Sequence, residues 1–237
     1  MPELKNKVAY ITGGSRGIGY GIAKTLLNHN MKVAISSRDK ENARRAASKL
    51  SKDESMVLAL QSNVSSLDAE RKSVKAILDY FGRLDVLVAN AGVGHLASIE
   101  NLTEAEWKET IDTNLTGVFN SVKACIDPLK DSKGYIITIA SLAGTNFFAN
   151  GSAYNASKFG LVGFSQAIML DLRNYGIKVT TIMPGSVATN FNNHSVSESD
   201  AWKIQPEDVG DIVADLLKMH PRTLPSKIEV RPLMPPR

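Results

Sequence analysis

Short apolar runs alternate with amphipathic stretches along almost the whole chain. A run of a few apolar residues between turn residues is typical of a buried strand, and apolar positions three or four residues apart indicate one face of a helix. Because strands and helices alternate so regularly, we predict an α/β protein with a parallel sheet of about seven strands and helices on both faces. The strand-like runs are residues 8–12, 32–36, 56–61, 86–89, 134–140, 178–183 and 227–230.

Local signals place helices between these runs. Ile18 and Leu26 lie on one face of the helix that is predicted after the first strand. Thr103 and Glu106 have the spacing of a capping box, and Pro206 suits the first turn of the last helix. The chain has no repeat and no linker, so we predict a single domain that spans all 237 residues.

The composition changes this picture little. With 43% hydrophobic residues, the chain suits one large domain with its own core. Cys125 is the single cysteine and the four histidines are scattered, so we expect no internal disulfide and no metal site. Residues 1–7 leave no room for a signal peptide, and no apolar run approaches the ~18 residues of a membrane span. We expect a cytoplasmic protein with no membrane partner.

The net charge of +4 raises the question of nucleic acid. The basic residues, however, alternate with acidic residues on amphipathic helices, which is typical of solvated helix faces. Aromatic residues make up 6% of the chain and do not interleave with the basic residues as stacking platforms would. We therefore expect no nucleic-acid partner.

Glycines gather in the loop after the first strand, Thr-Gly-Gly-Ser-Arg-Gly-Ile-Gly at residues 12–19. Glycine permits a tight turn and lets the backbone approach a pyrophosphate, which would lie at the N-terminus of the following helix. The strand before the loop and the helix after it favour a dinucleotide over an ordinary turn. The candidate cofactor-binding residues are Gly13, Ser15, Arg16, Gly17, Ile18 and Gly19.

The end of the second strand indicates which dinucleotide is bound. Sites for NAD usually place an Asp or Glu there to hold the ribose 2′-hydroxyl. Here Ser37 can donate a hydrogen bond to a 2′-phosphate and Arg38 can pair with it, while Arg16 can approach from the other side. Asp39 is interpreted as the N-cap of the next helix. We predict NADP(H) rather than NAD(H).

One stretch after the fifth predicted strand brings together a hydroxyl, a phenol and an amine. Ser141 ends the strand, and Tyr154 and Lys158 lie four positions apart on one helix face. A phenol beside an ammonium is an acid whose pKa can be tuned. The pair alone is weak evidence, because Tyr20 and Lys24 repeat it inside an ordinary helix. A surface pair, with the serine as a turn cap, is the alternative interpretation.

Taken together, these motifs resemble those of the classical short-chain dehydrogenase/reductase family over nearly the whole chain. The family's cofactor fingerprint is similar to residues 12–19, its element after the fourth strand to 89–92, and its segment over the nicotinamide to 184–189. The resemblance implies a Rossmann-type, doubly wound sheet. The family's catalytic tetrad falls on Asn114, Ser141, Tyr154 and Lys158.

The resemblance also implies hydride transfer between the nicotinamide and a carbonyl or secondary alcohol. Tyr154 would be the acid or base, and Ser141 would position the reacting oxygen. Lys158 would lower the pKa of the tyrosine and bind the ribose, and Asn114 would hold a water that relays protons. The further cofactor contacts that it implies are Asn63, Val64, Asn90, Ala91, Gly92, Tyr154, Lys158, Pro184, Gly185, Val187 and Thr189.

The chain departs from the family's pattern in places. Asn63 stands where the family commonly has Asp, Ala89 replaces an Asn, and residues 227–237 lack the common glycine-rich ending. In relatives, the helices at 103–126 and 153–175 pair subunits, so we expect a homodimer or homotetramer. Packing of the second helix on the chain's own sheet is the alternative.

Residues 186–204 are expected to form a lid over the substrate, and we call them the lid segment. Phe191 and Trp202 are its aromatic residues, while Phe147 and Phe148 are expected to add an apolar wall. These side chains favour a small or medium, partly apolar carbonyl or alcohol substrate. For His95, a place in the pocket and a place on the surface remain open.

Two other functions stay under consideration. The first is a 3-oxoacyl-(acyl-carrier-protein) reductase, in which interface arginines help to dock the acidic carrier protein. Those places hold Asp127, or its neighbour Ile126, and Leu170, so we rank this function second. The other is a regulator that senses NADP(H) without turnover, which would be expected to lose part of the tetrad.

Overall fold

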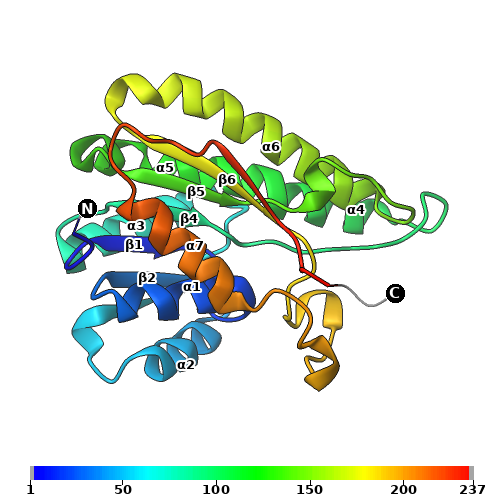
Figure 1. Cartoon of the computed structure of the whole chain (residues 1–237), viewed down its shortest axis with the longest axis horizontal. Helices are drawn as coiled ribbons and strands as arrows, with labels where there is room; N and C mark the ends of the chain where they lie inside the picture. The colour runs from blue at the N-terminus through cyan, green and yellow to red at the C-terminus, as the bar shows by residue number, and fades with distance from the viewer. Residues whose placement is uncertain (1–2, 235–237) are drawn as a thin grey trace.

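The computed structural model describes residues 3–234; residues 1–2 and 235–237, which belong to the chain's two ends, lie outside this description. One parallel sheet runs through the molecule in the order β3-β2-β1-β4-β5-β6-β7 (Figure 1). The seven predicted strands are confirmed, to within a residue or two at their ends. The strands are β1 Val8–Ile11, β2 Lys32–Ser37, β3 Val57–Gln61, β4 Val86–Ala89, β5 Tyr135–Ile139, β6 Lys178–Pro184 and β7 Lys227–Val230.

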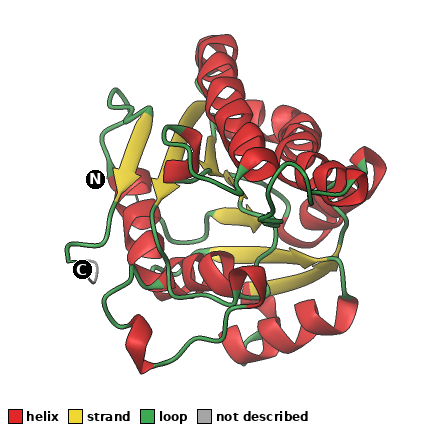
Figure 2. Ribbon diagram, turned by 90° about the vertical axis from the view of Figure 1, so that its right-hand side faces the viewer, coloured by secondary structure: helices red, strands yellow, loops and turns green. Residues whose placement is uncertain are grey.

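Helices cover both faces of this sheet (Figure 2). Alternate residues of a strand point to opposite faces, so each strand feeds two cores. In β1, Ala9 and Ile11 face the core shared with α1 and α7, whereas Val8 and Tyr10 face the core shared with α3, α5 and α6. The helices are α1 Gly17–Asn28, α2 Lys40–Leu50, α3 Leu67–Phe81, α4 Glu104–Ile111, α5 Gly117–Ser132, α6 Ser152–Leu172 and α7 Pro206–Lys218.

The helix ends follow the local sequence signals. Asp39 caps α2 by accepting a hydrogen bond from the backbone N–H of Asn42, and Thr103 and Glu106 form the predicted capping box of α4. The helix expected over residues 103–126 differs from the prediction, because a π-helical turn at Asp112–Thr116 separates α4 from α5. Within residues 3–234, no helix combines the length and apolar character needed to cross a membrane.

The strand order reverses between β1 and β4. In an open parallel sheet, ligands bind beyond the carboxyl ends of the strands at this switch point. The loops after the two strands meet there, since the N–H of Thr12 donates to the carbonyl of Val88 at 3.1 Å and the N–H of Asn90 donates to Oγ1 of Thr12 at 3.0 Å. The topology therefore brings the glycine loop against residues 90–94.

Two glycines let α1 and α7 approach closely. A Cβ added at Gly21 would lie 2.5 Å from the carbonyl carbon of Pro206, and one added at Gly210 would lie 2.5 Å from Oγ1 of Thr25. Both contacts are shorter than real Cβ contacts, and the first is with rigid backbone. The packing of these helices thus requires glycine.

We predict that Gly21→Ala lowers the free energy of unfolding by about 1–3 kcal/mol, because the added methyl forces α1 away from α7. Urea denaturation measures this change. The matched control is Gly163→Ala in α6, where an added Cβ meets nothing within 4 Å; alanine there should raise the stability by up to ~1 kcal/mol. Equal effects of the two substitutions would contradict this account.

Candidate functional site

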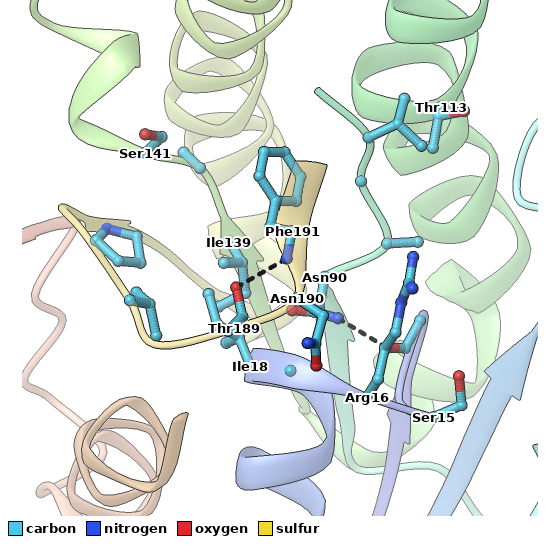
Figure 3. A pocket seen from close by; sticks show the side chains of 18 of the residues that line it. Ser15, Arg16, Ile18, Asn90, Thr113, Ile139, Ser141, Thr189, Asn190 and Phe191 are labelled. Atoms are coloured by element: carbon cyan, nitrogen blue, oxygen red, sulfur yellow. Dashed lines mark hydrogen bonds between the residues drawn. The ribbon is translucent and has the colours of Figure 1, made fainter. Parts of the chain in front are cut away.

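A cavity of about 410 Å³ opens at the carboxyl ends of the strands. Loops that follow β1 to β6 line it, and Figure 3 shows how some of their side chains lie. Two predicted site residues, Gly19 and Asn114, do not line the cavity. The predicted residues that do are Gly13, Ser15, Arg16, Gly17, Ile18, Ser37, Arg38, Asn63, Val64, Asn90, Ala91, Gly92, Ser141, Tyr154, Lys158, Pro184, Gly185, Val187 and Thr189.

The glycine loop has the geometry that dinucleotide binding requires. Gly13 and Gly17 have φ values of 64° and 56°, which favour glycine. A Cβ at Gly19 would lie 2.5 Å from the side-chain nitrogen of Asn90. Gly19 therefore lies behind the cavity lining, where the lack of a side chain lets Asn90 pack closely. Arg16 precedes α1 without a side-chain cap, and the N–H groups of the first turn therefore suit an anion.

Asn90 holds the glycine loop in place. Its side-chain amide donates to the carbonyls of Thr12 at 2.9 Å and Gly13 at 3.2 Å. Oγ1 of Thr12 accepts from the N–H groups of Asn90 and Ala91, both at 3.0 Å. Sequence reasoning missed the role of Thr12, although its place at the end of the first strand beside the glycines was a signal.

Asn114 is fully buried in the π-helical turn and acts as a clamp. Its Oδ1 accepts from the N–H of Val93 at 2.8 Å. Its amide donates to the carbonyl of Val93 at 2.8 Å and to the hydroxyl of Ser157 at 3.1 Å. Both amide hydrogens are therefore used within the protein. The side chain positions the loop after β4, and its part in a proton relay stays a prediction.

Three of the four predicted catalytic residues gather on one wall of the cavity. Ser141 follows β5, and its Oγ accepts from the N–H of Ala143 at 3.1 Å. Tyr154 lies in the first turn of α6, and Lys158 follows one turn later with its Nζ 5.7 Å from the tyrosine ring centroid. That Nζ is buried and donates to the carbonyl of Ile139 at 3.0 Å. The end of β5 and the start of α6 thus bring together hydroxyl, phenol and amine.

Burial moves the pKa values of two of these groups in opposite directions. Because removal from water disfavours a charge, burial lowers the pKa of Lys158 to about 8. Burial also raises the pKa of Tyr154, and the hydrogen bond with Ser141 opposes this rise. Burial is the largest influence on the phenol in the structure, and the lowering of its pKa by Lys158 stays a prediction. At neutral pH the phenol keeps its proton, as a proton donor must.

Arg38, the residue expected to read a 2′-phosphate, forms an ion pair across the edge of the cavity. Its guanidinium lies 3.0 Å from Oε1 of Glu109 in α4. Oε2 of the same carboxylate lies 2.9 Å from Nε2 of His95, and these two hydrogen bonds lower the pKa of Glu109. His95 thus faces α4 and does not line the cavity. A phosphate at Arg38 would compete with a carboxylate that the sequence did not reveal.

The lid segment contributes a different set of side chains from the predicted one. The ring of Phe191 packs 5.8 Å from that of Tyr154, centroid to centroid. In Figure 3, residues 189–191 cross the cavity between Ser141 and the glycine loop. The wall predicted from Phe147 and Phe148 is wrong, because neither lines the cavity, and Trp202 does not line it either. From the lid segment, Ser186, Asn190, His194 and Lys203 also line the cavity. Ser36 and Val93 line it beside predicted residues, and the sequence analysis missed Ser62, Thr113, Ile139 and Ala140, which line it as well.

Among the residues that the structure describes, no group of three or more His, Cys, Asp or Glu side chains is arranged to hold a metal ion. The glycine loop, the open N-terminus of α1 and the cationic side chains fit a dinucleotide, and the phenol and amine fit proton transfer beside it.

A family model described as short chain dehydrogenase matches residues 7–200. The chain belongs to the short-chain dehydrogenase/reductase family. Members of this family are oxidoreductases with nicotinamide cofactors. The family accounts for the joint presence of the glycine loop, the residues after β4 and the wall formed by Ser141, Tyr154 and Lys158.

Individual members of the family show how similar the chain is to proteins of known activity. It is 38% identical over 190 residues to a 3-oxoacyl-[acyl-carrier-protein] reductase of Chlamydia muridarum, covering 79% of this chain and 77% of that protein. It is 36% identical over 193 residues to trans-4-hydroxycyclohexanecarboxylate dehydrogenase of Sinomonas cyclohexanicum, covering 79% and 74%. In structure it resembles an alcohol dehydrogenase from the archaeon Thermococcus sibiricus complexed with 5-hydroxy-NADP, with a TM-score of 0.90, 28% identity and coverage of 98% and 99%. Other similar solved structures hold NADP or NADH.

The buried amine of this short-chain dehydrogenase makes its stability depend on pH. The pKa of Lys158 is about 8 in the folded chain and ~10.4 in the unfolded chain, so the unfolded state binds more protons between these values. The cost of burying the charge is complete below pH 8 and disappears as the pH approaches 10.

We predict that the stability of the wild type rises by about 2–3 kcal/mol between pH 7 and pH 10 relative to that of Lys158→Met. Urea denaturation of both proteins at the two pH values measures this difference. The control is Lys24→Met, at the duplicated motif in α1. An ion pair with Glu207 raises the pKa of Lys24, so its contribution is complete throughout this range and should not change. A constant difference for Lys158→Met would contradict the assignment.

Proposed function

We propose that this protein is an NADP(H)-dependent oxidoreductase that transfers a hydride between the nicotinamide and the carbonyl or secondary alcohol of a small or medium substrate. The observation that carries the proposal is the placement of Ser141, Tyr154 and Lys158 on one wall of the cavity that the glycine loop also lines. A proton donor is thereby held beside the place that suits the dinucleotide.

In carbonyl reduction, the bound cofactor supplies the hydride. Negative charge then develops on the carbonyl oxygen, and a positioned acid stabilises it by donating a proton. Tyr154 is this acid, because burial keeps its phenol protonated at neutral pH. Ser141 donates a second hydrogen bond to the same oxygen. In the reverse direction the phenolate accepts the proton of the alcohol.

Lys158 supports the proton transfer. Its Nζ approaches the phenol from the side of β5 and donates to the carbonyl of Ile139. Because burial lowers its pKa to about 8, the amine can hold or release a proton near neutral pH. It therefore stabilises the phenolate when that form appears and passes a proton back to the phenol. The family resemblance adds a contact with the nicotinamide ribose.

The surroundings of Tyr154 bear on the choice of substrate. The ring of Phe191 lies against that of Tyr154, so an apolar side chain stands beside the place where the substrate would react. A hydroxy acid on a six-membered ring, named for the Sinomonas relative, is a small and partly apolar substrate. We therefore rank a small carbonyl or hydroxy-acid substrate first.

Reduction of a 3-oxoacyl group on a carrier protein is the second candidate, favoured by the 38% identity to the Chlamydia reductase. An acidic carrier needs basic residues at its docking place. Here Asp127 is almost fully exposed in α5, and Leu170 is 52% exposed in α6. An acidic and an apolar residue at these places weaken such docking, so this function ranks below the first.

Pairing of two or four copies through α4, α5 and α6 belongs to the same proposal. Large apolar side chains are exposed on these helices by 42–52%, and an exposed apolar patch is typical of a contact surface. They are Trp107, Phe119, Phe159 and Leu170.

We predict that Tyr154→Phe lowers turnover by about 10²- to 10⁴-fold, because the proton donor is lost, and leaves NADPH affinity within about twofold. The readout is NADPH oxidation with aldehydes, diketones, 3-oxoacyl thioesters and sugars. The control is Tyr20→Phe, which changes the same four-residue motif in α1 and should have no effect. Full turnover by Tyr154→Phe would refute the mechanism.

The choice of cofactor is tested at Arg38. Loss of its charge-assisted hydrogen bonds to the 2′-phosphate should weaken NADPH binding in Arg38→Ala by about 10- to 100-fold and leave NADH binding nearly unchanged. Glu109→Gln removes the competing carboxylate and should tighten NADPH binding severalfold. Fluorescence titration gives both affinities, with Arg44→Ala in α2 as the control for loss of an exposed arginine. If Arg38→Ala weakened NADPH and NADH binding equally, the NADP(H) assignment would fail.

A further inference from the structure

The lid segment contains a buried carboxylate that holds two cationic or donor side chains. Asp200 has a side chain that is 4% exposed, and its Oδ1 lies 2.6 Å from Nζ of Lys203. Its Oδ2 lies 2.7 Å from Nε2 of His194 and accepts from the N–H of Ser197 at 3.0 Å. These hydrogen bonds, the one from Lys203 foremost, lower the pKa of Asp200, so it stays ionised. The carboxylate thus fixes both neighbours.

Both neighbours of this carboxylate line the cavity, whereas Asp200 does not. The lysine side chain is 18% exposed, and its ammonium has three hydrogens, of which Asp200 takes one. Of the described residues that line the cavity, none is an Asp or a Glu. The cations of the lining are Arg16, Arg38, Lys158 and Lys203, and the carboxylates that pair with Arg38 and Lys203 lie outside the lining, so the lining itself favours an anionic ligand.

Along the lid segment, the pair comes after the residues that lie beside the glycine loop and beside Tyr154. Thr189 lies beside the glycine loop, where a Cβ added at Gly17 would be 3.3 Å from its methyl group. Phe191, two residues later, lies against Tyr154. His194 follows Phe191, and its backbone carbonyl accepts from the side chain of Asn190 at 3.0 Å. His194 therefore follows both Thr189, beside the glycine loop, and Phe191, beside Tyr154.

The end of the lid segment pairs with the residues after β6, and this pairing holds Lys203 in place. The N–H of Ile204 donates to the carbonyl of Ser186 at 3.1 Å, and the N–H of Ala188 donates to the carbonyl of Ile204 at 2.9 Å. Lys203 is therefore held next to the residues that directly follow β6, on a rigid part of the cavity wall.

We propose that His194 and Lys203, held by Asp200, bind a free carboxylate of the substrate. The substrates are then oxo acids and the matching hydroxy acids, with the carboxylate at the lid segment and the reacting carbon at Tyr154. This inference rests on the proposed function for its reaction but not for its binding site. After its bond to Asp200, the ammonium of Lys203 keeps two hydrogens for the carboxylate, and the imidazolium form of His194, whose Nε2 is engaged with Asp200, would add its Nδ1–H.

The test compares 4-oxopentanoate with its methyl ester on the protein loaded with NADP⁺, where a ketone and an oxidised cofactor cannot react. Calorimetry should show that the wild type binds the acid at least tenfold more tightly than the ester. Lys203→Met should reduce this preference to about twofold or less, whereas Lys203→Arg should keep most of it. The matched control is Lys218→Met, which breaks an Asp-x-x-Lys pair with Asp215 outside the cavity.

Folding of the variants is controlled by a second substitution. Lys203→Met leaves Asp200 with one cationic partner fewer, and Lys203→Met combined with Asp200→Asn removes both charges together. If the single variant unfolds at a lower temperature, the double variant provides the comparison, and it should also lose the preference for the acid.

The outcomes separate the sources of the anion. Equal binding of acid and ester by the wild type overturns the proposal. So does a Lys203→Met variant that keeps the acid preference but binds NADPH several times more weakly, since the anion would then be the cofactor's pyrophosphate. Reduction of the ester as efficiently as the acid, measured by NADPH oxidation, also overturns it while leaving the proposed function intact. A retained acid preference without any turnover would refute the proposed function and support the carboxylate site.

Discussion

The close contact between the loops after β1 and β4 is the constraint on which the rest of the site depends. Asn90 donates two hydrogen bonds to Thr12 across the switch point, and the glycines allow the backbones to meet. Asn114 extends this contact by clamping Val93 from the π-helical turn. Because these groups are paired, and Thr12 and Asn114 are buried, a shift of one would leave others without partners. The glycine loop, the loop after β4 and, through the bond from Asn114 to Ser157, helix α6 are thus held in one frame.

Loss of hydration governs the chemistry inside this frame. The same burial keeps the phenol of Tyr154 protonated and lowers the pKa of the Lys158 ammonium to about 8. The free side chains have pKa values of about 10 and 10.4, and burial moves the two values apart, so that the phenol stays protonated while the amine titrates close to neutral pH. The fold supplies this tuning at a cost in stability, which is the usual compromise at an active site.

Two ion pairs, one at Arg38 and one at Lys203, hold cations of the cavity lining. In the first, Glu109 shares Arg38 with any incoming phosphate, and in the second, Asp200 holds Lys203 and His194. Each carboxylate orients a cation without lining the cavity itself. The cavity therefore keeps a positive lining that suits a dinucleotide phosphate and a substrate carboxylate, while the nearby acids keep the cations from repelling one another.

The sequence by itself determined the sheet, the order of its elements and the glycine loop. These follow from apolar periodicity and from glycine, which are local properties, whereas the tetrad was predicted from the family resemblance. Only the tertiary structure decided what Asn114, Arg38 and the lid segment do. The partner of Asn114 is Val93 and that of Arg38 is Glu109, and both lie on other elements. In the lid segment, irregular backbone separates Asp200 from the His194 that it holds. The rise in the pKa of Tyr154 was also decided only by the tertiary structure. Burial depends on everything packed around a residue, and the neighbouring residues in the sequence do not reveal it.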